Sequence, residues 1–444
     1  MHGICRRERD KWLLESTKVT DDPRRVPVGE AEAFARLLVL EGGRVFDSTG
    51  RDVREASILI RGNVIEEVLP AGSNIWPKDA CVLDLKGMTV MPGLIDAHTH
   101  LTYTEPGLPI EVAQSEADCT MRALERLRYF LETGVTSVRD AGSHGDVPFR
   151  IKEWVRQNRL PLPRVFAAGC LITGTGGHAA EKLSAVSSHY GKIREASGAD
   201  DWRNAVRQEF KKGADVIKVA SHFSREEIAA AVDEAHTLGL KVMCDAETFY
   251  IDWAVDAGVD CIEHPLPRTD EAICKMAEKR VQSVPTLIPY AIIIGQYGGY
   301  FGSTSRRFTF SCEANLDVVR RMKKAGVKIG VGTDIVMDWF RYLPEAYIEE
   351  LRMYKSAGFS THEALMAATL VNAEILDMDR LLGSLEPGKL ADVLIVDGRP
   401  DECLDDLKNV HTVIRDGHIV LEQGRLRQER HEGWSLSKKS AAKW

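Results

Sequence analysis

The sequence predicts an α/β protein, a (β/α)8 barrel joined to a small accessory β domain, and three observations lead to this fold class. Short apolar runs of strand character alternate with segments of helical periodicity over roughly 240 residues. Several of these runs end in an ionisable residue, and the active site of a (β/α)8 barrel lies at the carboxyl ends of its strands. The two ends of the chain instead show the alternation of half-buried sheets. A chain of 444 residues has room for both parts.

Several predicted barrel strands carry an ionisable residue at or near their end. These runs are 135–140, 215–220, 241–245, 259–264 and 328–334. Their ionisable residues are, in the same order, Asp140, Lys218, Asp245, His264 and Asp334. Between two of the runs, the segment 226–238 places Ile228, Val232 and Ala235 on one stripe, which is the spacing of an amphipathic helix. Strands that alternate with such helices indicate parallel β/α units.

The accessory domain is predicted from two separate pieces of chain, 37–90 and 385–425. Apolar residues follow a strand pattern in both pieces, at 45–47, 58–60, 64–65, 393–396 and 413–414. We expect hairpin turns at pairs that easily supply a positive φ, which are Gly42-Gly43, Gly62-Asn63 and Asp416-Gly417. The barrel then occupies residues 91–384, with an extension at 1–36 and a basic tail at 426–444.

An apolar run at the start of the predicted barrel ends in two histidines. Residues 92–100 read Pro-Gly-Leu-Ile-Asp-Ala-His-Thr-His. Residues two apart in a strand point to the same face, so His98 and His100 can direct two imidazoles to one metal ion. Two histidines on a strand are equally compatible with buried, hydrogen-bonded side chains, and the rest of the chain has to decide between these interpretations.

Further motifs follow in order, and together they resemble the metal-dependent amidohydrolase superfamily, nearest to its imidazolonepropionase-like and prolidase-like branch. The motifs are MPGLIDAHTH (91–100), TSVRD (136–140), GTGGH (174–178), IKV (217–219), IEH (262–264), GTD (332–334) and GKLAD (388–392). Similar proteins fold their two chain ends together into a β-sandwich beside the barrel. We therefore expect the accessory domain to be a β-sandwich.

The resemblance implies a metal centre. In similar proteins a carboxylated lysine bridges two metal ions, and Lys218 matches that lysine. Asp334 matches an aspartate that binds a metal and takes a proton from the attacking water, and His264 matches a ligand on the sixth strand. With His98 and His100, these residues predict one or two divalent ions per chain, with Zn2+ favoured and Mn2+, Fe2+ or Co2+ as alternatives. The competing interpretation of Lys218 is a buried lysine paired with an acid. The competing interpretation of Asp334 is a structural aspartate that caps the next segment.

The fifth strand departs from the pattern of the family. Similar proteins commonly read Lys-Val-x-x-His-Ala there, whereas residues 241–246 read Lys-Val-Met-Cys-Asp-Ala. Asp245 therefore stands where a histidine ligand is expected. A carboxylate can bind Zn2+, Mn2+ or Fe2+ through oxygen, so we predict Asp245 as a metal ligand. The alternative is a second metal position that is weak or empty.

Other residues are candidates for contact with a substrate. His178, which ends the GTGGH motif, resembles a residue of a loop that reaches the substrate after the third strand, and we predict a catalytic role for it. A merely flexible turn is the alternative, because glycines leave the loop backbone free to adopt many conformations. His222 follows the fourth strand and either contacts substrate or lies on the surface. Tyr103, Arg139 and His144 are lesser candidates for polar contacts with the substrate.

The long segment 288–310 carries tyrosines and phenylalanines among many glycines and serines. A loop of about 20 residues in a compact domain is uncommon and often functional. We expect this segment to cover the mouth of the barrel and bind an apolar or aromatic group. Contact between subunits is the alternative role.

Charge and composition narrow the classes of partner. The formal net charge is −8, and no dense basic stripe crosses the body of the chain, which argues against binding to nucleic acid. No run of about 18 apolar residues is present, so we expect no membrane partner. Nine cysteines at irregular spacing, without a C-x-x-C motif, indicate thiols in a reducing compartment, by default the cytoplasm. The expected partners are a small-molecule substrate and, from the resemblance, further copies of the chain in a homo-oligomer.

The predicted activity is hydrolysis of a C–N bond in an amide-like substrate by metal-activated water. The candidate substrates are N-acyl amino acids or dipeptides, aryl amides, ureas and carbamates. Two other classes stay open. One is a hydrolytic deaminase with a single metal and an unmodified lysine, and the other is a noncatalytic scaffold, which the retained histidines and Asp334 argue against.

Overall fold

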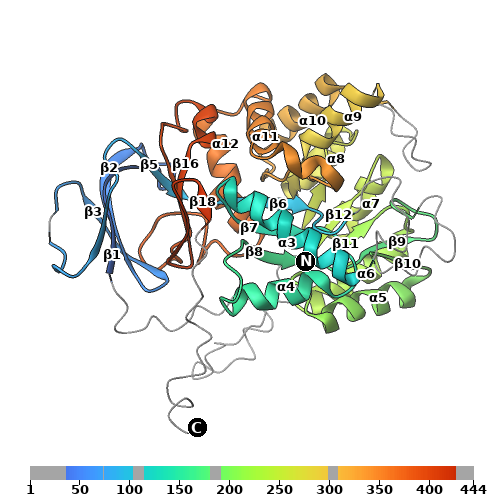
Figure 1. Ribbon diagram of the computed structural model, residues 1–444. Helices are drawn as coiled ribbons and strands as arrows, with labels where there is room; N and C mark the ends of the chain where they lie inside the picture. Colours follow the sequence, from blue (N-terminus) through green and yellow to red (C-terminus); the bar gives the residue numbers. More distant parts are fainter. Residues whose placement is uncertain (1–36, 74, 104–114, 181–191, 299–308, 427–444) are drawn as a thin grey trace, which may run out of the picture.

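The structure, a computed structural model, describes residues 37–426 apart from 74, 104–114, 181–191 and 299–308. A mainly β part stands beside a larger α/β part (Figure 1). The predicted extension at 1–36 lies outside the described residues, and so does the basic tail from 427 onward. Among the helices of the described part, none is long and apolar enough to cross a membrane.

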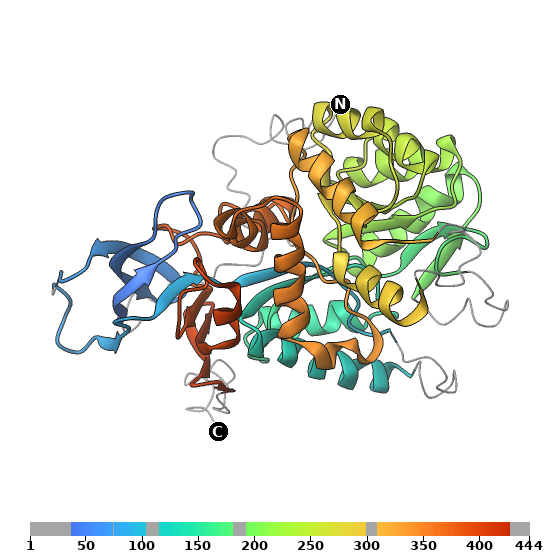
Figure 2. The same cartoon turned by 90° about the horizontal axis from the view of Figure 1, so that it is seen from above.

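The β part is a nine-stranded sheet that both ends of the chain build together. Its order is β18-β17-β16-β15-β5-β1-β2-β3, with β4 paired to β1. Its strands are β1 (Leu37–Val45), β2 (Arg54–Arg61), β3 (Val64–Pro70), β4 (Cys81–Asp84), β5 (Thr89–Pro92), β15 (Val393–Val396), β16 (Val410–Arg415), β17 (His418–Glu422) and β18 (Arg425–Leu426). Antiparallel pairing of β5 with β15, with Val90 opposite Ile395, joins the two pieces of chain. In Figure 2 the C-terminal strands lie between the N-terminal strands and the α/β part.

Strand β15 belongs to two cores at once because alternate side chains of a strand point to opposite faces. Leu394 and Val396 join the large core of the α/β part. Val393 and Ile395 join the separate core of the β part. The β part is therefore packed against the α/β part through one face of its own sheet.

Two of the three predicted turns are confirmed. Gly62-Asn63 connects β2 to β3, and Asp416-Gly417 connects β16 to β17. The prediction for Gly42-Gly43 is wrong, because both glycines lie within β1 at a shift of register against β2. Gly42 has a φ of 69°, and an irregularity of this kind is a common reason for glycine inside a strand.

The α/β part alternates strands with helices, as the sequence predicts. Its strands are β6 (Leu94–Thr99), β7 (Val135–Asp140), β8 (Arg164–Ala167), β9 (Leu171–Gly174), β10 (Ile193–Ala196), β11 (Val216–Ala220), β12 (Lys241–Asp245), β13 (Cys261–Glu263) and β14 (Gln282–Val284). Its helices are α3 (Glu116–Glu132), α4 (Val147–Arg156), α5 (Ala199–Lys212), α6 (Arg225–Thr237), α7 (Phe249–Ala257), α8 (Asp270–Glu278), α9 (Leu287–Tyr297), α10 (Cys312–Lys324), α11 (Glu345–Ser356), α12 (Thr361–Met366) and α13 (Asn372–Ile375). The predicted strands 135–140 and 241–245 match β7 and β12, and the predicted helix 226–238 overlaps α6.

The parallel strands form two sheets, and further backbone hydrogen bonds connect these sheets to each other and to segment 328–334. One sheet has the order β6-β7-β8, and the other has the order β10-β9-β11-β12-β13-β14. The amide of Asp215, just before β11, donates to the carbonyl of Ala167 in β8 at 2.9 Å. Ser283 in β14 forms a parallel bridge with Ile329, and the amide of Ala97 in β6 donates to the carbonyl of Val331 at 2.9 Å. These bonds give the α/β part a barrel-like arrangement.

The predicted eighth strand, 328–334, is present as an isolated bridge rather than a regular strand. Its backbone crosses β6 closely at Gly332, where a Cβ atom would lie 2.7 Å from the backbone nitrogen of His98. Two residues later, the amide of Asp334 donates to the carbonyl of His98. This close approach brings the end of segment 328–334 to the first histidine of the predicted site.

The prediction of a loop over 288–310 is wrong for its first part, because Leu287–Tyr297 form helix α9. The cap of this helix comes from a distant residue: the carboxylate of Glu350 in α11 accepts hydrogen bonds from the amides of Leu287 and Ile288, at 2.9 and 2.8 Å. A cap supplied by a distant helix leaves no signature in the local sequence. The helix ends at Gly298, which has a φ of 62°. Residues 299–308 lie outside the described part.

Candidate metal centre

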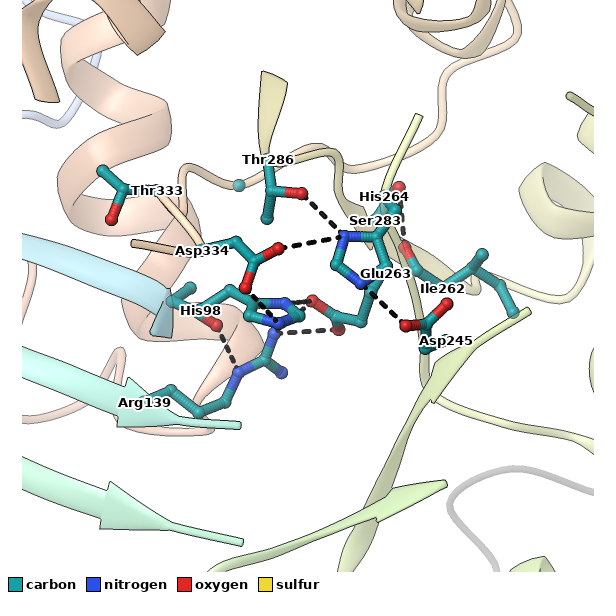
Figure 3. A network of polar contacts seen from close by, with 12 residues as sticks. His98, Arg139, Asp245, Ile262, Glu263, His264, Ser283, Thr286, Thr333 and Asp334 are labelled. Atoms are coloured by element: carbon teal, nitrogen blue, oxygen red, sulfur yellow. Dashed lines mark hydrogen bonds and ion pairs between the residues drawn. The ribbon is translucent and has the colours of Figure 1, made fainter. Parts of the chain in front are cut away.

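Three histidines and two aspartates gather at the carboxyl ends of the parallel strands. Figure 3 shows four of them, which are His98, His264, Asp245 and Asp334. Oδ1 of Asp334 lies 3.6 Å from Nε2 of His98 and 3.3 Å from Nε2 of His100, and its Oδ2 lies 3.8 Å from Nδ1 of His264. Nitrogen or oxygen atoms of His98, His264 and Asp334 all lie within 4.8 Å of one another. The residues that the sequence predicts as metal ligands from three separate motifs are thus brought together.

Each of the three histidines is held by its Nδ1 atom. Nδ1 of His98 donates to Oε2 of Glu263 at 2.6 Å, and Nδ1 of His100 donates to the carbonyl of Gly142 at 2.8 Å. Nδ1 of His264 lies 2.7 Å from the hydroxyl oxygen of Thr286. A hydrogen bond at one ring nitrogen fixes the tautomer and leaves the lone pair of the other nitrogen for a metal.

A buried ion pair lies behind His98. Arg139 donates through Nη2 to both carboxylate oxygens of Glu263, at 2.9 and 3.1 Å, and through Nε to the carbonyl of Ala97. Its guanidinium is directed at protein groups, so we interpret Arg139 as a residue that orients His98 through Glu263 rather than one that contacts substrate. Sequence reasoning missed Glu263, whose only signal is its place next to His264 in the IEH motif.

The backbone at two of the ligand positions is unusual. His264, directly after β13, has a φ of 66°, and Asp334, at the end of segment 328–334, has a φ of 45°. Non-glycine residues in this left-handed region carry a conformational cost, and such residues cluster at functional sites. The two side chains meet, with Nδ1 of His264 3.8 Å from Oδ2 of Asp334.

The electrostatics of the cluster suit a cation. Burial lowers the pKa of His98 well below its ordinary value, and the nearby charges of Lys218 and His264 lower it further, so this imidazole is neutral. Burial opposes ionisation of Asp334, but the hydrogen bond from His100 and the charges of His264, His100 and Lys218 together hold its pKa below the ordinary value. A neutral imidazole, as at His98, and an ionised carboxylate, as at Asp334, are forms that bind metals.

Lys218 lies on β11 in the same α/β part. Its side chain is 1% exposed, and its Nζ has no hydrogen-bond partner among the described residues. The Nε2 atom of His98 is likewise buried without a hydrogen-bond partner in that part of the chain. Buried polar atoms are nearly always paired, so two such atoms in one site indicate a missing partner. The donor set therefore fits a divalent cation.

Asp245 forms a second group of contacts on the other side of His264. Its Oδ2 lies 3.0 Å from Nε2 of His264 and 3.4 Å from Nε2 of His178. The side chain of Asp245 is 2% exposed. The carboxylate that replaces the expected histidine thus faces the centre, as its predicted role as a ligand requires.

A comparison with known families now bears on this geometry. The model of the amidohydrolase family matches residues 89–420. The chain belongs to the amidohydrolase family. It is a hydrolytic enzyme that acts on C–N bonds.

The relatives of this amidohydrolase include members of the branch that the sequence predicts. A solved prolidase in complex with N-methylphosphonate-L-proline is 30% identical, with a TM-score of 0.77, over 87% of this chain and 100% of that one. The imidazolonepropionase of Symbiobacterium thermophilum is 26% identical over 392 residues, 79% of this chain and 85% of the relative. The ochratoxinase of Aspergillus niger is 26% identical over 419 residues, 84% of this chain and 83% of the relative. These likenesses establish a TIM-barrel-like α/β fold with an extra β domain.

Amidohydrolases generally bind a divalent metal, and among the described residues His98, His264 and Asp334 form a cluster that could hold one. The identity of the metal, the number of ions and the modification of Lys218 stay predictions.

The predicted substrate-contact residues of this amidohydrolase lie in different surroundings. The ring of Tyr103 stacks on His100, with centroids 4.2 Å apart, and its hydroxyl is buried without a hydrogen-bond partner among the described residues. His144 is half-buried and its amide donates to Thr102 at 2.8 Å. His222 packs against Tyr250 with centroids 5.6 Å apart. Tyr103 therefore touches the cluster, whereas the described ring contact of His222 is with an aromatic side chain of α7.

Proposed function

We propose that this amidohydrolase hydrolyses the C–N bond of an amide-like small molecule. The candidate substrates are N-acyl amino acids or dipeptides, aryl amides, ureas and carbamates. The observation that carries the proposal is the convergence of histidine Nε2 atoms on Asp334 and Asp245 at the strand ends. The names of the relatives support it, since one is a prolidase and another an imidazolonepropionase.

The chain would hold one or two divalent ions, Zn2+ in the first place, because imidazole nitrogens and carboxylate oxygens suit that ion. The ligands would be His98, His100, Lys218, Asp245, His264 and Asp334. When bound, the metal polarises the carbonyl group and lowers the pKa of water.

Lys218 would serve as a carbamate. Its ammonium group would first lose one proton, and the neutral amine would then form a bond to the carbon of carbon dioxide and release a second proton. The cationic side chain would thereby become an anionic carbamate. The support is the burial of its Nζ without a hydrogen-bond partner among the described residues, near the neutral imidazole of His98. An ammonium group in that place would repel a divalent ion, whereas a carbamate would bind it.

Asp334 would act as the general base. Its lowered pKa keeps the carboxylate ionised, and its oxygens lie within 3.8 Å of all three histidines. It would take a proton from the attacking water and then deliver it to the leaving nitrogen, which would otherwise depart as a poor anionic leaving group. Glu263 would keep the imidazole of His98 oriented during this transfer.

An aromatic cluster supports a substrate that carries an aryl or other flat apolar group. Phe249 and Tyr250 begin α7, which follows β12 after the short connection 246–248, and their ring centroids lie 4.4 Å apart. Trp253 and His222 contact this pair, with centroids 5.0 Å from Phe249 and 5.6 Å from Tyr250, respectively. Phe249 is 53% exposed although it lies beside the carboxyl end of the strand that carries Asp245. Exposed rings at that edge would stack on an aromatic part of the substrate.

We also infer that the parallel strands form a closed (β/α)8 barrel and that the β part is a β-sandwich. Three contacts between strands support the closed ring: the hydrogen bond from Asp215 to Ala167, the parallel bridge between Ser283 and Ile329, and the hydrogen bond from Ala97 to Val331. Two cores on opposite faces of β15 support a layered β domain.

A mass-resolved screen tests the proposal. Wild-type enzyme with Zn2+ and bicarbonate is incubated with an N-acyl amino acid, a dipeptide, an aryl amide, a urea and a carbamate, and both products of cleavage are measured. The expected result is cleavage of at least one of these at the C–N bond and loss of turnover in Asp334→Asn, whose circular dichroism matches wild type. Release of ammonia from an amino-substituted ring, with one metal and unmodified Lys218, would support the deaminase instead. No turnover in any class would contradict the proposal.

A further inference from the structure

The loop that ends the GTGGH motif is fixed against the barrel. The amide of Gly174 donates to the carbonyl of His222 at 2.8 Å. At Gly177 an added Cβ would lie 2.6 Å from the amide nitrogen of His222, so only glycine permits this approach. The loop is therefore docked on the segment that follows β11, and the interpretation as a merely flexible turn does not describe it.

One residue couples this loop to the strand that carries Asp245. The carbonyl of Ser221 accepts a hydrogen bond from the amide of His178 at 2.6 Å. The amide of Ser221 donates to the carbonyl of Asp245 at 3.0 Å. The backbones of His178 and Asp245 are thus fixed relative to each other through a single intervening residue. The short contact between their side chains follows from this arrangement.

The donor atoms form two groups with similar spacing. Around Oδ1 of Asp334 lie Nε2 of His98 and His100, at 3.6 and 3.3 Å. Around Oδ2 of Asp245 lie Nε2 of His264 and His178, at 3.0 and 3.4 Å. Two ligand atoms about 2.1 Å from one tetrahedral ion lie roughly 3.4 Å apart, so each group has the spacing of ligands to a common ion.

We propose that His178 is a metal ligand and completes, with Asp245 and His264, a second ion site whose expected histidine is missing from the fifth strand. The inference deepens the proposed function and rests on it for the identity of the ion as Zn2+. His264 fits this site because Thr286 holds its Nδ1 and its Nε2 faces Asp245. The same loop position that was predicted to reach substrate thus supplies the nitrogen that the fifth strand lacks.

The test is the binding of Zn2+ itself. Four full-length proteins are compared: wild type, His178→Ala, His178→Ala/Asp245→His and the control His411→Ala. Each is freed of metal with a chelator and dialysed against a series of free Zn2+ concentrations with bicarbonate. Zinc per chain is measured by mass spectrometry. His411 is a half-buried histidine of β16 whose Nδ1 contacts Thr412, away from the strand ends of the barrel. His178→Gln replaces the alanine variant if the latter's metal-free circular dichroism differs from wild type.

The expected result is two ions in wild type and in the control. In His178→Ala we expect one ion of unchanged affinity and a second bound at least about tenfold more weakly, and recovery of the second in the double variant. Superimposable isotherms for wild type and His178→Ala, at one ion or at two, would overturn the inference. Loss of the second ion in an enzyme that fails the substrate screen would uphold the inference and remove the proposed function. Hydrolysis of a substrate by an enzyme whose zinc isotherm does not depend on His178 would uphold the proposed function and overturn the inference about His178.

Discussion

The ion pair of Glu263 and Arg139 sets the direction in which His98 presents its nitrogen. Removing the negative charge in Glu263→Gln weakens the bond to Nδ1 and leaves the Arg139 guanidinium without its anionic partner. We expect a loss of about 10- to 100-fold in metal affinity and in kcat/KM. Metal titration and initial rates measure both.

The matched control for this prediction is Glu271→Gln, at an exposed position in the first turn of α8. That variant should bind metal and turn over substrate as wild type does. Wild-type zinc affinity in Glu263→Gln would show that His98 does not depend on this carboxylate.

At the scale of residues, the members of the candidate metal cluster were largely predictable from the sequence, and the groups that support them were not. His98, His100, His264 and Asp334 stand in short motifs whose spacing reflects the local geometry of strand ends. Arg139 was predicted to contact substrate because the sequence shows only that it ends a strand, whereas its direction depends on Glu263, 124 positions away. Contacts of that range are fixed by the closure of the fold and leave no local pattern.

At the scale of elements, helix α9 depends on the buried carboxyl group of Glu350. Burial raises the pKa of Glu350 to about 8, against the opposing effect of the amides of Leu287 and Ile288. The folded state then holds a proton more tightly than the unfolded chain, whose glutamate has its ordinary pKa near 4.5. The contribution of this group is complete below the ordinary pKa and falls as the pH rises through about 8. We therefore expect the free energy of unfolding of wild type, measured with urea, to fall as the pH rises toward about 8, and we expect this fall to be absent in Glu350→Gln.

The neighbouring variant Glu349→Gln is the control for the pH series, since Glu349 has a side chain that is 44% exposed and lies on the same helix. It should keep the pH dependence of wild type. Parallel curves for wild type and Glu350→Gln between about pH 5 and 8 would contradict the assignment.

The start of helix α7 is expected to select aromatic substrates. Phe249→Ala removes the most exposed ring of the cluster, so kcat/KM for an aryl substrate should fall about tenfold relative to that for an alkyl analogue, from a loss of roughly 1 to 1.5 kcal/mol of stacking. Phe210→Ala on α5, which is 40% exposed, is the control. An equal effect on aryl and alkyl substrates would show that the ring stabilises the helix and does not recognise the substrate.

Regular elements with a clear period were predictable, and elements shaped by distant contacts were not. Runs such as 135–140 and 241–245 match β7 and β12 because apolar strands between turns carry their own signal. The segment 328–334 forms only a bridge, since its backbone bonds are divided between Ser283 and β6. Helix α9 was predicted as a loop because its cap comes from α11.

At the scale of the whole molecule, one buried cation joins the α/β part to the β part. Arg164 of β8 donates to Asp392 at 3.0 and 3.1 Å and to Asp416 at 2.9 Å, and all three side chains are buried or nearly so. Arg164→Met leaves two carboxylates without their partner. We expect a loss of about 3–5 kcal/mol in the free energy of unfolding, measured with urea.

The corresponding surface control is Arg399→Met, because Arg399 and its partner Glu402 are 57% and 55% exposed. That change should cost less than about 1 kcal/mol. Equal effects of the two substitutions would show that the buried pair does not hold the two parts together.

The composite nature of the β part was visible from the alternation at both ends of the chain, and the pairing of β5 with β15 realises it. The bulge at Gly42 was not predictable, because a glycine pair reads the same in a turn and within a strand. Assembly into a homo-oligomer, a cytoplasmic location and the absence of nucleic acid and membrane partners stay predictions.

The most direct test of the central claim is a zinc titration of the metal-free enzyme against its best substrate from the screen, with Asp334→Asn in parallel. We predict no hydrolysis without metal, recovery of C–N bond cleavage as Zn2+ is added, and no recovery in Asp334→Asn. Undiminished hydrolysis by the stripped enzyme, or recovery of the variant to wild-type rates, would contradict the account.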